Sequence, residues 1–277
     1  MEDMSTTAEL DRLDAHREAR IRNAASSRGP ASFFWGDMVT APGQTVTGAP
    51  GRWSPLPAGE AGVRVDATAA DGIRIGGALV DGTAILHYDE ADGPTVASFP
   101  DGAEGIVFSY DRSKFALQVW NPHSEWANRF AGITAYPCDD AWRIEGRIET
   151  VAPGRTVAIP HHRDPRPIDT PVTAEVVFEV DGAEYRLAAT RGARPDSLLV
   201  LFADATNGVE TYSAGRSLEL DSAGPGRVIL DFNYAALLPC SFSLAWNCPI
   251  PPVENHLPIA VRAGERNAVD AQGEPLL

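Results

Sequence analysis

Two carboxylates and an arginine in the last third of the chain have residue types and positions suited to acid–base chemistry. Asp204 follows the apolar run LLVLF and Asp231 follows VIL, so each is expected where a strand ends. A carboxylate placed there can exchange a proton with a substrate. Arg216 carries five fixed donors that suit a carboxylate or phosphate group. The sequence therefore predicts an enzyme that hydrolyses, or eliminates a group from, a small organic molecule.

Other polar residues between positions 204 and 255 complete the candidate site. Tyr212 and Glu254 are expected to act with the two aspartates in catalysis. The substrate-binding residues are expected to be Arg216, Asn207, Asn233, Trp246 and Asn255. Structural interpretations stay open for all of them: a turn at ADATNG, an internal ion pair of Arg216 with an aspartate, and backbone caps by Glu254 and Asn255.

The stretch CPIPPVEN, residues 248–255, predicts a rigid loop, because its three prolines fix the backbone and remove three donors. Catalytic or binding groups are often held on such loops. Buried free thiols are expected for Cys240 and Cys248, with a disulfide between them or a zinc site as alternatives. No metal ligand set and no cofactor motif is predicted.

A non-catalytic protein that binds a small molecule or a protein partner is the alternative function. An apolar pocket lined by Leu237, Leu238, Phe242 and Trp246, with the carboxylates paired off, would favour it. A purely structural role of the same residues is a third interpretation.

Three stretches carry a resemblance to a known family: DATNGVETYSAGR (204–216), DFN (231–233) and CPIPPVEN. With FAGITAYPCDDAWRIEGRIE, they make the chain resemble domain of unknown function 1684 of bacteria and archaea, over roughly residues 105 to 266. The resemblance implies no activity. Where the family has an arginine, a tyrosine and an asparagine, this chain has Tyr234, Ala236 and Leu237, which implies a divergent member with a more apolar pocket.

The elements that must position these residues are strands. A helix is expected within residues 1–29, attached by a narrow apolar stripe and without a functional role. A small glycine-rich β-domain is expected over 30–118, where Asp-Gly dipeptides recur, and a β-sandwich or barrel over 119–277. Strands are expected at KFALQVW, WRIEGRIETV, TAEVVFEV, EYRLAAT, SLLVLFAD, RVILDFNY and LPIAVRAG. The fold class is therefore all-β with one N-terminal helix.

Composition excludes some partners. The 277 residues include 23 Lys and Arg against 38 Asp and Glu, a formal charge of −15, which repels nucleic acid and anionic membranes. The N-terminus lacks the apolar segment of a secretory signal, and three cysteines are too few for a secreted disulfide framework. We expect a cytoplasmic protein that binds a small molecule. If the protein forms an oligomer, we expect a homodimer.

Overall fold

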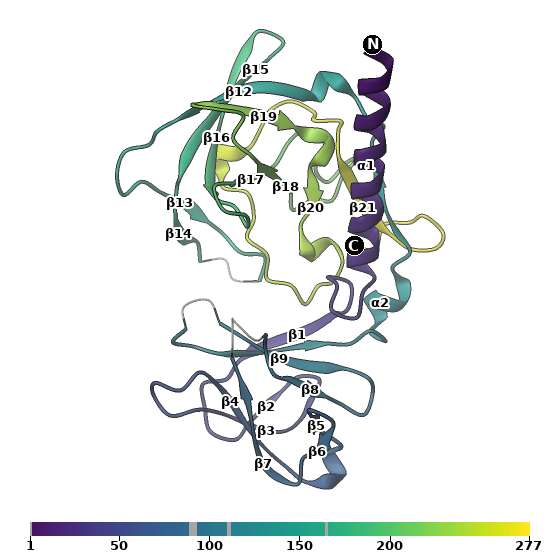
Figure 1. Ribbon diagram of the computed structural model, residues 1–277, viewed down its shortest axis with the longest axis vertical. Coiled ribbons are helices and arrows are strands. Elements are labelled where there is room, and N and C mark those ends of the chain that lie inside the picture. The colour runs from purple at the N-terminus through teal and green to yellow at the C-terminus, as the bar shows by residue number, and fades with distance from the viewer. Residues whose placement is uncertain (1, 89–92, 110–111, 164–165) are drawn as a thin grey trace. The chain divides into compact units, whose positions relative to one another are not determined.

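The computed structural model describes residues 2–88, 93–109, 112–163 and 166–277, and Figure 1 shows its elements. The chain divides into two compact units. Met1–Arg22 and Phe130–Leu277 together make the first, called here the C-terminal unit. Asn23–Arg129 make the second, called here the inserted unit. The N-terminal helix thus belongs to the same unit as the last half of the chain.

The C-terminal unit is built on a seven-stranded antiparallel sheet that curves into a half-barrel (Figure 1). In spatial order its strands are β19 (Arg227–Asp231), β12 (Arg143–Glu149), β15 (Ala174–Val180), β16 (Ala183–Arg191), β17 (Leu198–Phe202), β18 (Arg216–Leu220) and β20 (Ala236–Leu237). Alternate residues point inward, so Val176, Leu187, Val200, Leu218 and Leu230 meet in one buried core.

Smaller elements close the ends of this half-barrel. β11 (Gly132–Ala135) pairs with β21 (Glu265–Val269), and β13 (Thr156–Ile159) pairs with β14 (Ile168–Pro171). Four short 3₁₀ turns lie between strands: Asp140–Trp142, Phe232–Tyr234, Pro239–Ser241 and Val253–Asn255. The third begins with Pro239 and the fourth follows Pro252, and the fixed φ of proline starts a turn readily.

The long helix α1 (Glu2–Ala24) belongs to this unit as far as Arg22. Within residues 7–22 Leu13 is the only buried side chain, 2% exposed, whereas Leu10 on the same face is 42% exposed. Polar contacts hold the rest of the helix. Arg17 Nη2 donates to the Tyr136 carbonyl at 2.8 Å, and Arg20 pairs with the buried Glu265.

The inserted unit has two antiparallel sheets around a separate core. The larger follows the order β1 (Phe33–Met38), β10 (Ala116–Trp120), β9 (Glu104–Phe108), β8 (Val96–Ser98), β5 (Arg74–Ile75) and β6 (Ala78–Leu79). The smaller follows β2 (Gln44–Val46), β3 (Ala49–Pro55), β4 (Gly62–Ala67) and β7 (Gly82–His87). A 3₁₀ turn (Ala69–Asp71) and the helix α2 (Glu125–Arg129) complete it. Trp53, Val63, Leu86 and Leu117 are fully buried between the sheets.

The all-β prediction with one N-terminal helix is confirmed. The predicted strand LPIAVRAG (257–264) is wrong, because this segment joins no sheet. Its backbone groups bond to the backbone of Ala203 and Ala205 and to two buried side chains, Asp204 and Arg216. Of the Asp-Gly dipeptides, Asp92 lies outside the described residues. No helix among the residues described is long and apolar enough to cross a membrane.

Candidate functional site

Asp204 and Arg216 form an ion pair inside the C-terminal unit. Arg216 Nη2 lies 2.7 Å from Asp204 Oδ2, and neither side chain is exposed to solvent. The guanidinium also donates to the Val261 carbonyl at 2.8 Å and to those of Ala263 and Glu265. A ligand cannot reach this arginine while it makes these contacts. The pair holds the segment from Val261 to Glu265 in place.

The second oxygen of Asp204 is also occupied. Oδ1 accepts hydrogen bonds from the backbone of Thr206 at 2.8 Å and of Val261 at 3.2 Å. Asn207 folds back on the same turn, where its Oδ1 accepts from the Asp204 backbone at 2.7 Å and its Nδ2 donates to the Tyr212 carbonyl at 2.9 Å. These are the turn contacts that the sequence left open as the structural interpretation.

Two further predicted residues tie separate turns together. Tyr212 donates its hydroxyl to the Cys240 carbonyl at 2.9 Å, and burial raises the pKa of the Tyr212 phenol. The buried Asn233 donates to the Asp139 carbonyl at 3.0 Å and to Asp231 Oδ1 at 2.9 Å. Asn233 Oδ1 accepts from the Asp139 backbone at 3.0 Å.

Asn255 and Glu254, adjacent in sequence, have opposite environments. Asn255 is 1% exposed, and its side chain hydrogen-bonds three backbone groups. It accepts from Ala188 N at 2.7 Å and donates to the carbonyls of Ala188 at 2.9 Å and Leu201 at 2.7 Å. Glu254 is exposed and pairs with Arg155 at 3.1 Å. Trp246 is half-buried. These residues do not converge on one surface.

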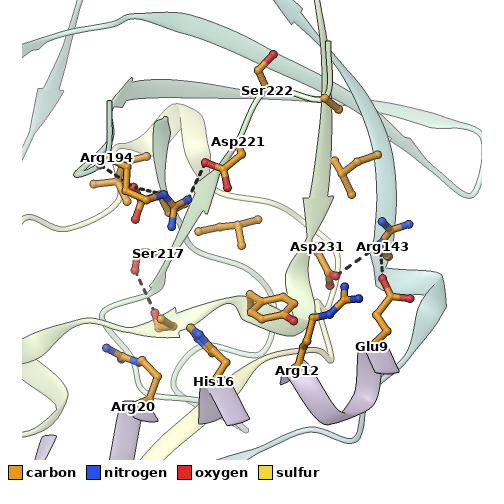
Figure 2. Close-up of a pocket in the computed structure, with 17 residues that line it drawn as sticks. Glu9, Arg12, His16, Arg20, Arg143, Arg194, Ser217, Asp221, Ser222 and Asp231 are labelled. Atoms are coloured by element: carbon orange, nitrogen blue, oxygen red, sulfur yellow. Dashed lines mark hydrogen bonds and ion pairs between the residues drawn. The ribbon is translucent and has the colours of Figure 1, made fainter. Parts of the chain in front are cut away.

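A cleft of about 680 Å³ lies elsewhere in the C-terminal unit, between α1 and strands of the half-barrel (Figure 2). We call it the helix–sheet cleft. Of the nine predicted site residues it includes one, Asp231. Its apolar surface comes from Leu199, Leu218, Ala223, Ile229 and Ala236, and the ring of Tyr234 also faces it.

Arginines and carboxylates line the helix–sheet cleft in equal numbers. The arginines are Arg12, Arg20, Arg143 and Arg194, and the carboxylates are Glu9, Glu219, Asp221 and Asp231. Figure 2 shows Arg143 with Asp231 on one side of the cleft and Arg194 with Asp221 on the other. In a chain of net charge −15, this balanced lining is a surface where an anion meets little repulsion.

Most of these charges are paired with one another. Arg143 Nε lies 3.3 Å from Glu9 and 3.8 Å from Asp231. Arg194 Nη2 lies 2.8 Å from Asp221, and this pair raises the pKa of the arginine.

The remaining two arginines, both on α1, differ in whether a carboxylate binds them. Arg20 binds Glu265 through two hydrogen bonds of 2.7 and 2.9 Å. Arg12 is exposed and forms no ion pair or hydrogen bond within the part of the chain that the structure describes. Arg12 is therefore the cation of this cleft that a ligand can take without displacing a protein carboxylate.

His16 lies between Arg12 and Arg20 on the same face of α1 (Figure 2). Its ring meets that of Tyr234 edge to face, with 5.0 Å between centroids. Partial burial lowers the pKa of His16, and the charges of Arg20 and Arg17 add to this while Glu265 opposes it. The lowered pKa favours the neutral imidazole at pH 7. Burial raises the pKa of Tyr234, and Asp231 and Glu9 add to the rise.

Sequence reasoning gave α1 no functional role and missed Arg12, His16 and Arg20. Their spacing was the available signal, because residues four apart lie on one face of a helix. Three basic or titratable residues on one face of a helix that otherwise carries many acids mark that face as distinct.

A protein-family model matches the chain. The model described as "Protein of unknown function (DUF1684)" matches residues 128–266, half of the sequence. The chain belongs to this family. All nine predicted site residues lie within the DUF1684 match, whereas the α1 wall of the helix–sheet cleft lies outside it.

A solved structure is similar to part of the chain. It is the solution NMR structure of an uncharacterized protein of Haloarcula marismortui, 33% identical, and the match covers 50% of this chain and 77% of that one with a TM-score of 0.42. No curated protein matches the chain.

Proposed function

We propose that this DUF1684 member binds a small organic anion in the helix–sheet cleft and that it acts as a binding protein. The ligand has one acidic group and an apolar body. The observation that carries the proposal is Arg12, an unpaired arginine over a cleft of about 680 Å³ whose other arginines are held by carboxylates. This volume lies in the range of small-molecule sites.

Arg12 suits the acidic group. A guanidinium presents planar, paired donors that match a carboxylate or phosphate, and such charge-assisted hydrogen bonds are stronger than neutral ones. The hydroxyls of Ser217 and Ser222 line the same cleft and donate to the backbone carbonyls of Ala236 and Gly224, so either would have to rotate to bond a ligand. Arg143 lies between the acidic Glu9 and Asp231, and its positive charge offsets part of their repulsion of an incoming anion.

The apolar body packs on the sheet. Leu199, Ile229 and Ala236 line the cleft, and the Tyr234 ring lies beside them. Burying an apolar group there gains about 25 cal/mol for each Å² removed from water. Charge at the rim and apolar surface within favour an aromatic or branched aliphatic acid over inorganic phosphate alone.

The binding test compares related probes. We expect benzoate and phenyl phosphate to bind, and the uncharged benzamide to bind at least tenfold more weakly, when isothermal titration calorimetry is run at low salt. Arg12→Gln should weaken benzoate binding by about 10- to 100-fold, because it removes a charge-assisted hydrogen bond of roughly 1.5–3 kcal/mol.

Arg22→Gln is the matched control. Arg22 lies on the same helix, is 68% exposed and pairs only with the exposed Glu18. Its substitution should leave the affinity for benzoate unchanged. Equal affinity of Arg12→Gln and wild type, or no binding of either anion, would refute the proposal.

An enzyme acting on the same ligand class is the second candidate, by hydrolysis or elimination. The observation that favours it is the neutral imidazole of His16 in a cleft that also holds Asp231. A neutral imidazole can act as a general base. Hydrolysis of 4-acetoxybenzoate, an ester that carries the acidic group, above the buffer rate, lost in His16→Gln with benzoate affinity retained, would support it. An unchanged rate in His16→Gln would exclude this base.

A further inference from the structure

Two thiols meet inside the C-terminal unit, away from the helix–sheet cleft. Cys240 lies in the 3₁₀ turn Pro239–Ser241, and Cys248 lies eight residues later. The backbone N–H of Cys240 lies 3.1 Å from Cys248 Sγ. Both cysteines are free thiols and buried, 0% and 3% exposed. The third cysteine, Cys138, is exposed and lies more than a hundred positions earlier in the sequence.

The contacts around the pair hold both cysteines in position. Tyr212 donates its hydroxyl to the Cys240 carbonyl at 2.9 Å. The backbone N–H of His162 donates to the Cys248 carbonyl at 2.9 Å. Pro239 and Pro249 fix φ next to each cysteine. These contacts therefore hold the Cys248 sulfur beside the backbone of Cys240.

The pair also favours thiolate chemistry. The side chain of Cys248, whose sulfur accepts the backbone N–H of Cys240 at 3.1 Å, lowers the pKa of Cys240. The side chain of Cys240 and burial raise the pKa of Cys248. One proton is thus lost more easily than from an isolated cysteine, and the second thiol stays protonated beside the thiolate. A thiolate next to a second thiol is the arrangement of a redox-active pair.

We propose that Cys240 and Cys248 form a reversible intramolecular disulfide when the protein meets a peroxide. One thiolate attacks a peroxide oxygen, the O–O bond breaks, and hydroxide leaves as water after taking a proton. The sulfenic acid that results is attacked by the other thiol. An S–S bond forms, the S–O bond breaks, and the thiol proton leaves with the hydroxyl as a second water. Two thiols are oxidised and one peroxide is reduced.

The disulfide has a measurable effect on stability. It closes a short ring between positions 240 and 248, which removes conformational freedom from the unfolded chain. For a unit of this size the entropy of such a ring corresponds to a rise in Tm of about 5 to 10 °C. The rise should disappear when dithiothreitol is added.

The experiment uses the full-length chain with Cys138→Ser, which removes the exposed thiol. The folded protein is treated with hydrogen peroxide, the peroxide is removed with catalase, and the chain is unfolded in urea with N-ethylmaleimide. Intact mass should show the loss of two hydrogens and no maleimide adduct. Untreated protein, and treated protein reduced with dithiothreitol, should carry two adducts.

Two results would overturn the proposal. In the first, treated protein still carries two adducts, or gains oxygen without losing hydrogen. In the second, the disulfide forms only when peroxide is added after the urea, which would show that the folded structure does not bring the sulfurs together. Cys240→Ser in the same background should block the loss of hydrogens. If that variant fails to fold, the measurement on Cys138→Ser protein still decides.

Discussion

Replacing Arg216 by Met tests whether the buried ion pair is structural. Methionine fills part of the space of the arginine stem and removes only the guanidinium. Asp204, with no exposed surface, is then left as an unpaired buried carboxylate. We expect the C-terminal unit to lose a large share of its free energy of unfolding.

The size of the loss follows from the contacts. Breaking a buried pair by removing one partner costs about 3–5 kcal/mol, because one charge is left without compensation. The carbonyls of Val261 and Ala263 also lose the donor that holds them, which adds roughly 1 kcal/mol. The expected total is about 4–6 kcal/mol, close to the whole stability of a typical domain. Adding Asp204→Asn removes the stranded charge and should recover about 2 kcal/mol or more.

Urea unfolding followed by tryptophan fluorescence measures this loss. Trp142 packs edge-on against Phe232, with 5.8 Å between the ring centroids. Its fluorescence therefore reports on the C-terminal unit. Trp142→Phe in the wild-type background identifies which transition belongs to that unit. Arg227→Met is the control, because Arg227 lies on β19 in an exposed pair with Glu145 at 3.1 Å. The free energy of unfolding of Arg227→Met should differ from that of wild type by less than about 0.5 kcal/mol.

A small effect of Arg216→Met would refute this reasoning. If the free energy of unfolding falls by less than about 1 kcal/mol, the pair is not needed for the fold. Arg216 would then return as a candidate anion clamp, as the sequence predicts. A double variant less stable than Arg216→Met alone would equally show that the stranded charge is not the cause.

Three further predictions concern other residues of the C-terminal unit. Asn255→Ala should cost about 2–4 kcal/mol in urea unfolding, because three buried backbone groups lose their partner. Gly264→Ala should cost about 2 kcal/mol or more in the same assay, because φ is +79° and an added Cβ would lie 2.6 Å from the Ala235 carbonyl oxygen. The pKa of His16 is lower in the folded protein, so the unfolded chain binds more protons below about pH 6.5. Its contribution to stability should therefore be present above pH 6.5 and fall as the pH drops toward the folded pKa, and Tm from pH 7.5 to 5 should fall less in His16→Gln.

For each of these three predictions, one result would contradict the reasoning. Asn255→Asp with wild-type stability would show that the amide donors are not needed. A folded Gly264→Ala with unchanged Tm would show that the turn relaxes. Identical pH profiles for wild type and His16→Gln would show that burial of this imidazole is not coupled to folding.

The sequence was sufficient for the fold class because local patterns decide it. Apolar runs such as TAEVVFEV and SLLVLFAD became β15 and β17 within a few residues of the expected bounds. LPIAVRAG has the same pattern and is not a strand. Its hydrogen bonds go to the backbone of Ala203 and Ala205 and to the side chains of Asp204 and Arg216. These partners are distant in sequence, so no local pattern could reveal them.

The candidate site was harder to predict, because polar residues in a β-core look the same whether they bind a ligand or the backbone. Asn233 and Asn255 are polar and clustered in sequence, yet both are buried and bonded to main chain. The helix–sheet cleft needs α1 to meet strands more than a hundred residues away. Only the i, i+4 spacing of Arg12 and His16 was visible beforehand.

The contact between Arg20 and Glu265 also sets an order of events during synthesis. The two residues are 245 positions apart, so at about 5–20 residues per second the ribosome needs about 12 to 50 s to make the partner of a helix that emerged first. The inserted unit is complete well before then and can fold in that interval. Until Phe130–Leu277 emerge, α1 lacks the rest of its unit, so this helix is open to chaperones during most of that interval.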